Sequence, residues 1–133
     1  MTDYFHLSLP ENDIRAISSI GLAHLGDAVY ELLVRSWLCA HGKATGRGLH
    51  RAAVELVRAP TQAELAQKIL PLLTEEEISV FKRGRNAHVN SIPHSASRSD
   101  YLTATALESL LGWLYLHGQT DRANQLFHVM MDS

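Results

Sequence analysis

Residues 19–40 limit the possible fold more than any other part of the sequence, because they read as one long helix that is apolar on two sides. On a wheel of about 100° per residue, one side carries apolar and small residues, namely Leu25, Val29, Leu32, Leu33 and Ser36. The opposite side carries Asp27 among Ile20, Val34 and Leu38. Such helices are typically buried. We therefore expect a central helix whose first side faces the core and whose Asp27 is embedded against a second apolar surface.

The rest of the chain also predicts helices, because no segment shows the alternation of a half-buried strand. The periodic segments are 11–18, 49–59, 60–73, 75–88, 100–117 and 121–131. Thr74 and Glu77 form a capping box, Thr120 is the expected cap of the last helix, and Gly42 and Gly118 are expected to end the two long helices. Residues 44–48 read as a linker and 89–99 as the longest loop. We expect a single all-α domain over residues 1–133.

Composition restricts the cellular setting and the kinds of site. Cys39 is the only cysteine, so no intrachain disulfide can form, and we expect a small buried side chain in a reducing cytoplasm. No apolar run reaches the roughly 18 residues of a membrane span, and the N-terminus lacks a basic region followed by an apolar one. The formal net charge is −2. Any binding of nucleic acid must therefore depend on a local basic patch.

A second acidic helix complements the first. Residues 100–117 hold Glu108 among leucines, and Gly112 follows one helical turn later. In the first helix, Gly26 directly precedes Asp27. The two glycines would let the helices cross closely with their acids facing each other, and a divalent cation would offset the repulsion between them. The alternative is that each acid is hydrogen-bonded to backbone or paired with an arginine. The candidate partners are Arg35, Arg47, Arg51 and Arg58.

Three motifs resemble the ribonuclease III family and occur in its order between residues 21 and 127. The segment LAHLGDAVYE resembles the family signature, TALESLLGWLYL resembles its second acidic motif, and FKRGRNAHVNSIP looks like the R-G-R-N-A segment of the Mini-ribonuclease III branch. The resemblance implies an all-α, ribonuclease III endonuclease domain-like helical bundle without a separate double-stranded-RNA-binding domain. By position it assigns Asp27 and Glu108 as the catalytic and metal-binding residues.

The resemblance also implies an activity and its partners. Members hydrolyse double-stranded RNA as homodimers with Mg²⁺, for which Mn²⁺ can substitute, leave 5′-phosphate products, and trim the paired ends of 23S ribosomal RNA precursors. Two positions depart from ordinary ribonuclease III, because Ala23 and Thr105 stand where it has carboxylates. The Mini branch shares this reduction to two acids. We therefore expect weak metal binding that waters and the scissile phosphate complete.

One basic stretch stands out in this acidic chain, because no acid lies between Phe81 and Ser99. Its candidate RNA-binding residues are Lys82, Arg83, Arg85, Asn86 and Arg98. Duplex RNA is recognised largely through phosphates and 2′-hydroxyls, which suits arginine, asparagine and serine side chains. The alternative is that these cations only complement the dipole at a helix end.

Two further expectations concern neighbouring residues and function. Glu31 is expected to form a structural ion pair with an arginine, and the apolar second side of residues 19–40 is expected to form the dimer surface. The competing functional hypothesis is a non-catalytic helical module that binds RNA or assists assembly on the same fold.

Overall fold

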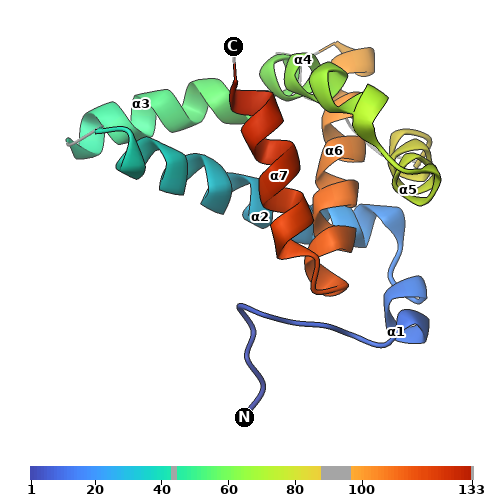
Figure 1. The fold of residues 1–133 in the computed structure, drawn as a ribbon. Helices are drawn as coiled ribbons and strands as arrows, with labels where there is room; N and C mark the ends of the chain where they lie inside the picture. The colour runs from blue at the N-terminus through green and yellow to red at the C-terminus, as the bar shows by residue number, and fades with distance from the viewer. Residues whose placement is uncertain (43–44, 88–96, 133) are drawn as a thin grey trace.

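The structure is a computed structural model that describes residues 1–42, 45–87 and 97–132. Its elements are α1 (Glu11–Arg15), α2 (Ser19–Ala40), α3 (Gly46–Val57), α4 (Ala59–Ile69), the 3-10 helix η1 (Leu70–Leu72), α5 (Glu75–Arg85), α6 (Arg98–Leu116) and α7 (Thr120–Met131) (Figure 1). No strand occurs within the described ranges, so the predicted all-α class is confirmed.

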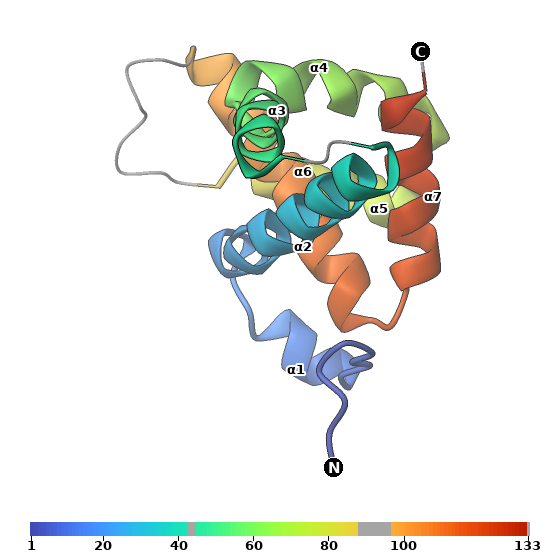
Figure 2. The ribbon, with the colours of Figure 1, turned by 90° about the vertical axis from the view of Figure 1, so that its left-hand side faces the viewer.

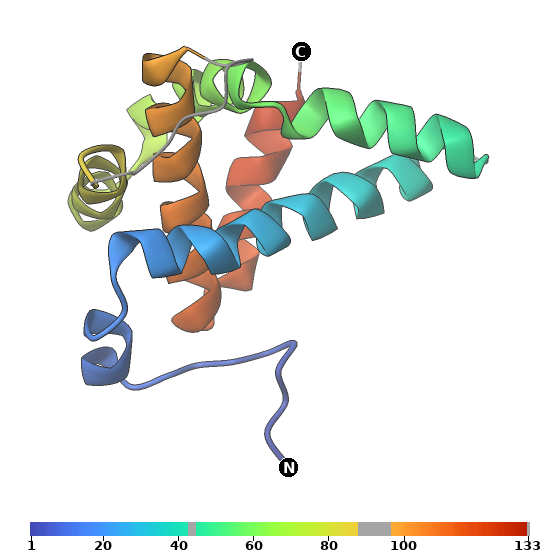
Figure 3. The same ribbon diagram turned by 180° about the vertical axis from the view of Figure 1, so that it is seen from behind.

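Helix α6 is the centre of the fold. It packs against α2, α4, α5 and α7, and most of its residues are buried. Figure 3 shows α2 lying across α6, and this pair makes the most extensive contact between any two elements. The prediction that residues 19–40 form the central helix is therefore wrong, because the leucine-rich 98–116 segment is apolar around a larger part of its circumference.

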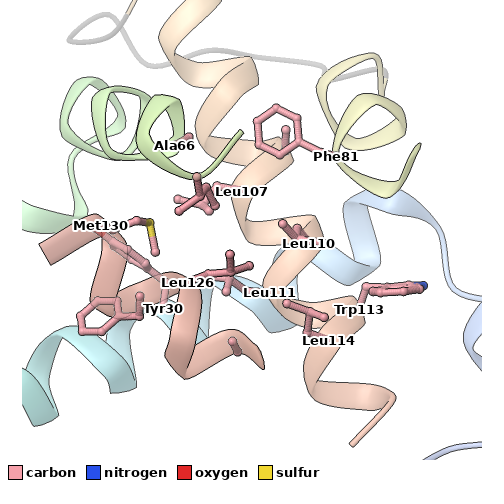
Figure 4. Packing of buried hydrophobic residues seen from close by; sticks show 14 of the residues in the cluster. Tyr30, Ala66, Phe81, Leu107, Leu110, Leu111, Trp113, Leu114, Leu126 and Met130 are labelled. Carbon is pink, nitrogen blue, oxygen red and sulfur yellow. The ribbon is translucent and has the colours of Figure 1, made fainter. Parts of the chain in front are cut away.

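The core gathers around the leucines of α6. Leu107, Leu110, Leu111 and Leu114 have no exposed surface. They meet Tyr30 from α2 and Leu126 and Met130 from α7, while Phe81 and Ala66 approach from α5 and α4 (Figure 4). Burial of a side chain of this size stabilises the folded state by about 1.5–3 kcal/mol. This cluster therefore holds α6 in a fixed position relative to its neighbours.

The N-terminal segment lies at the end of the molecule opposite α4 (Figure 2). The Leu9 amide donates a hydrogen bond to the Leu116 carbonyl oxygen over 2.8 Å. Glu11 Oε2 lies 2.7 Å from His117 Nε2, which ties α1 to the residue after α6. No helix within the described ranges combines the length and the apolar character needed to cross a membrane.

Several helix ends were predicted correctly from local sequence. The Glu77 amide donates to Thr74 Oγ1 over 3.1 Å and the Thr74 amide donates to Glu77 Oε1 over 2.9 Å, which completes the capping box. Gly42 and Gly118 have φ values of +83° and +73°. Such values favour glycine because it has no Cβ to clash.

Other boundaries differ from the prediction. Helix α3 begins at Gly46 inside the predicted linker, because Thr45 Oγ1 accepts the Gly48 amide over 3.0 Å and caps the helix. Thr120 is the first residue of α7 and not its cap, and the preceding Gln119 makes no capping bond through its side chain. Helices α1 and α5 are shorter than predicted, because they end at Arg15 and Arg85. The predicted loop 89–99 falls mostly outside the described residues.

The side of α2 that faces the core is the opposite of the one that was predicted to do so. Apart from Ala23, the buried residues of α2 follow a spacing of four and are Leu22, Gly26, Tyr30, Val34 and Leu38. Leu32 on the other side is 57% exposed, and Leu25 and Val29 are half-buried. The stripe that contains Gly26 faces α6, because only a residue without a side chain permits the observed approach. Cys39, which was expected to be buried, is also exposed.

Candidate active site

The site forms where α2 crosses α6 through two glycines. A Cβ atom placed on Gly26 would overlap the carbonyl oxygen of Glu108, and one placed on Gly112 would overlap the carbonyl oxygen of Leu22. The backbones of the two helices are therefore in direct contact. This crossing is the one that the glycine beside each acid predicted.

The crossing brings Asp27 and Glu108 together although they are far apart in the chain. Asp27 lies beside Gly26 at the rim of the contact and is exposed, whereas Glu108 is half-buried. The prediction of an embedded Asp27 is therefore wrong, because a residue next to the buried stripe points about 100° away from it. The two carboxyl groups still lie close enough for each to affect the site electrostatically. Burial, followed by the charge and the neighbouring carboxyl group of Asp27, raises the pKa of Glu108 to about 8.

No basic side chain neutralises this pair within the described ranges. Arg35 Nη2 lies 3.0 Å from Glu31 Oε1, and Arg58 Nη1 lies 3.1 Å from Glu55 Oε1. The first contact confirms the expected ion pair of Glu31. Neither Asp27 nor Glu108 forms an ion pair with a residue that the structure describes, so the arginine-partner interpretation of these two acids finds no support there.

Two uncharged side chains complete the surroundings of Glu108. Gln62 Nε2 donates to Glu108 Oε2 over 3.5 Å from the first turns of α4. The Tyr30 hydroxyl donates to the Leu56 carbonyl oxygen over 2.7 Å, and its pKa is raised by burial and by the nearby charge of Glu108. Sequence reasoning missed Gln62. Its only signal is a polar residue on the face of α4 that also carries Ala66 and Ile69.

The donor set fits a small, hard, hydrated cation. Carboxylate oxygens are the usual protein ligands of Mg²⁺, which commonly binds through one or two carboxylates and keeps several waters. Among the described residues no group of three or more His, Cys, Asp and Glu side chains could hold an ion. Ala23 and Thr105 are buried and contribute no carboxylate. The site therefore offers two carboxylates, those of Asp27 and Glu108, to a cation.

The candidate RNA-binding residues lie at the end of α5 and the start of α6. Arg85 Nη2 donates to Ser99 Oγ over 3.3 Å, which places Arg85 close to the segment that begins with Arg98. Asn86 is the C-cap of α5 and Lys82 is exposed in its last turn. Arg83 instead lines a groove with Glu76 and Arg15. The structure thus brings Arg85 to the first turn of α6, which Arg98 begins, whereas Arg83 lines a different groove.

The charge pattern of α5 keeps both interpretations of these cations open. Its first turn holds Glu75, Glu76 and Glu77 and its last turn holds Lys82, Arg83 and Arg85, so the side chains complement the helix dipole. None of the four cations among the candidates forms an ion pair with a described residue. Their charges are therefore available to an external anion. The intervening residues 88–96 lie outside the described residues.

The fold and the paired acids define a class of protein that comparison with known families identifies. Residues 21–119 match the ribonuclease III domain. A crystal structure of protein FN1578 from Fusobacterium nucleatum superposes with a TM-score of 0.81 at 31% identity and covers 90% of this chain and 95% of that chain.

Curated relatives narrow the class. The chain is 41% identical over 111 residues to Mini-ribonuclease 3 of Symbiobacterium thermophilum, covering 84% of this chain and 85% of the relative. It is 39% identical over 118 residues to Mini-ribonuclease 3 of Enterococcus faecalis, covering 87% and 89%. The chain belongs to the ribonuclease III family, in its Mini-ribonuclease 3 branch. It is an endoribonuclease, so the hypothesis of a non-catalytic module is not supported.

Proposed function

We propose that this endoribonuclease cleaves double-stranded RNA with Mg²⁺, or with Mn²⁺ in its place, and leaves 5′-phosphate products. The observation that carries the proposal is the contact between Asp27 and Glu108, since no described basic side chain pairs with either acid. A half-buried Glu108 whose ionisation is disfavoured by the charge of Asp27 is costly for folding alone. A bound divalent cation turns the same arrangement into a favourable one.

The residues of the site have separate tasks in this proposal. Asp27 and Glu108 would hold the cation, which when bound supplies a Lewis acid that stabilises charge on a reacting phosphate. Asp27, being exposed, faces the side from which a large substrate can arrive. The Glu108 carboxylate accepts a hydrogen bond from Gln62, and the close helix crossing fixes the Glu108 backbone. The protein thereby contributes two fixed carboxyl groups at the exposed face of α2 that carries Asp27.

The choice of duplex RNA, and of 23S ribosomal RNA precursor as the substrate, draws on two supports. The first is the basic set Lys82, Arg83, Arg85, Asn86 and Arg98, which lies where α5 ends and α6 begins. The second is the likeness of the FKRGRNAHVNSIP segment to the Mini-ribonuclease III branch. We further propose that the protein works in the reducing cytoplasm, which suits a chain with a single cysteine.

We also propose a homodimer, on a different surface from the one first expected. Val34 and Leu38 on the predicted dimer side are buried inside the chain. The exposed apolar surface is instead lined by Tyr4, Phe5, Leu25, Ala28, Val29, Leu32 and Tyr115. Exposed apolar patches often mark protein interfaces. A two-fold dimer would supply one site for each strand of the duplex.

Cleavage of a duplex RNA tests the catalytic proposal. Asp27→Asn and Glu108→Gln should each reduce the rate at least about a hundredfold, because a metal ion supplies several kcal/mol of transition-state stabilisation. Glu31→Gln, which alters a neighbouring acid paired with Arg35, should cut at nearly the parent rate. Parent-like cleavage by either active-site variant, or full activity of the parent in EDTA, would overturn the proposal.

A further inference from the structure

Gln62 is almost completely enclosed beside the acidic pair. It lies in the second turn of α4, is 3% exposed, and contacts both the end of α3 and Glu108 on α6. Buried glutamine side chains normally have all their polar atoms hydrogen-bonded, because desolvating an amide without compensation is unfavourable. The hydrogen bonds of Gln62 therefore show what the local structure needs from it.

The orientation of the Gln62 amide is determined by its neighbours. Its Nε2 lies 2.8 Å from the Val57 carbonyl oxygen, which has no donor to offer. Exchanging the amide oxygen and nitrogen would therefore place two oxygens against each other. The second hydrogen of the same nitrogen is directed to Glu108 Oε2 at 3.5 Å. Both donors are thus used, one on the backbone and one on the carboxylate.

The remaining atom, Oε1, has no partner. It is the only buried side-chain nitrogen or oxygen within the described ranges that lacks a hydrogen bond. Leaving such an atom unsatisfied costs about 1–3 kcal/mol. Because Oε1 shares a carbon with the nitrogen that contacts Glu108, it lies within a few ångström of the Glu108 carboxylate. A donor that arrives there with the cation would satisfy it.

We propose that Gln62 is a positioning residue of the metal site: its Nε2 orients the Glu108 carboxylate, and its free Oε1 accepts a hydrogen bond from a water carried by the cation. This inference rests on the proposed function, since it requires a hydrated ion at Asp27 and Glu108. Hydrogen-bonding partners of metal ligands typically change affinity or activity by about 10–100-fold when removed. We expect removal of the Gln62 amide to weaken metal binding by a factor of that size.

Direct ion binding tests the proposal without RNA. Mn²⁺ binding to the full chain is measured by electron paramagnetic resonance of the free ion, for the parent, Gln62→Met and Gln67→Met. Methionine keeps most of the volume and removes both polar atoms. Gln67 lies on the exposed side of the same helix and is the matched control. We expect Gln62→Met to weaken binding about 10–100-fold and Gln67→Met to leave it unchanged.

A second measurement keeps the test valid should Gln62→Met fold poorly. In the ¹⁵N-labelled parent, the side-chain amide signals of Gln62 should shift with Mg²⁺ and broaden strongly with Mn²⁺, while those of Gln67 should not. Equal Mn²⁺ binding by the parent and folded Gln62→Met, or a Gln62 signal that does not respond to the ion, would overturn the proposal.

The outcomes also separate this inference from the proposed function. Should the parent bind neither ion, or bind them equally after Asp27→Asn and Glu108→Gln, the metal-dependent function itself fails. Should binding require both acids but not Gln62, only the positioning role is lost. Cleavage by Gln62→Met should additionally need a higher Mg²⁺ concentration while its affinity for duplex RNA in EDTA stays at the parent value, because Gln62 is placed beside the ligands and not on the substrate.

Discussion

The acidic pair should make the metal-free protein less stable than a variant without it. The pKa of Glu108 is raised from its ordinary value of 4.5 to about 8, first by burial and then by the charge of Asp27. The folded state therefore binds a proton more tightly than the unfolded state does. Replacement of Glu108 by Gln keeps the size of the side chain and removes the ionisation. We expect Glu108→Gln to be the more stable protein above neutral pH.

The sign and size follow from proton linkage. Below pH 4.5 Glu108 is protonated in both states and has no effect. Between pH 4.5 and about 8 only the unfolded state has lost the proton, so stability falls by up to about 1.4 kcal/mol per pH unit. The full range sets an upper limit of about 5 kcal/mol. Because Glu108 is only half-buried and water screens its charge, we expect roughly 2 kcal/mol.

Urea unfolding in EDTA provides the assay, at pH 5 and pH 8 and at one protein concentration. Tryptophan fluorescence reports the transition, since Trp113 is 6% exposed in the folded protein. Glu108→Gln should match the parent at pH 5 to within about 1 kcal/mol and exceed it by roughly 2 kcal/mol at pH 8. Glu31→Gln loses only an exposed ion pair and should cost about 0–1 kcal/mol at both pH values. Equal stability of Glu108→Gln and parent at pH 8 would refute the reasoning.

Three further predictions test the crossing, the basic patch and the dimer. Gly26→Ala should destabilise the protein by at least about 3 kcal/mol in thermal unfolding, because its Cβ would overlap backbone atoms that cannot move aside. Gly46→Ala, which has open space around it, should change stability by less than about 1 kcal/mol. Equal losses would argue against a backbone contact at the crossing. Arg85→Ala should weaken duplex RNA binding and lower the dependence of log K on log salt by about one. An unchanged slope in filter binding would remove Arg85 from the interface. Leu32→Asp should yield monomers in sedimentation equilibrium. Ile20→Asp should remain dimeric, because Ile20 is exposed on α2 but lies outside the apolar patch. A dimeric Leu32→Asp would place the interface elsewhere.

The sequence alone determined the features that depend on neighbours along the chain. Helical periodicity, the Thr74–Glu77 capping box and the left-handed Gly42 and Gly118 involve residues within about one turn of each other, so they can be predicted without knowledge of packing. The glycine beside each acid also predicted the close helix crossing, because only glycine permits direct backbone contact. The order of the three motifs also indicated the ribonuclease III family, which residues 21–119 match.

The tertiary structure decided what depends on residues distant in the chain. Both sides of α2 are apolar, so only the packing on α6 shows that the Gly26 stripe is buried and that Leu32 is exposed. Asp27 is exposed because it lies one position away from that stripe. Gln62 reaches Glu108 across 46 residues of sequence, and no local pattern encodes such a contact. Periodicity determines which residues share a face, but the shape and volume of the rest of the core determine where that face points.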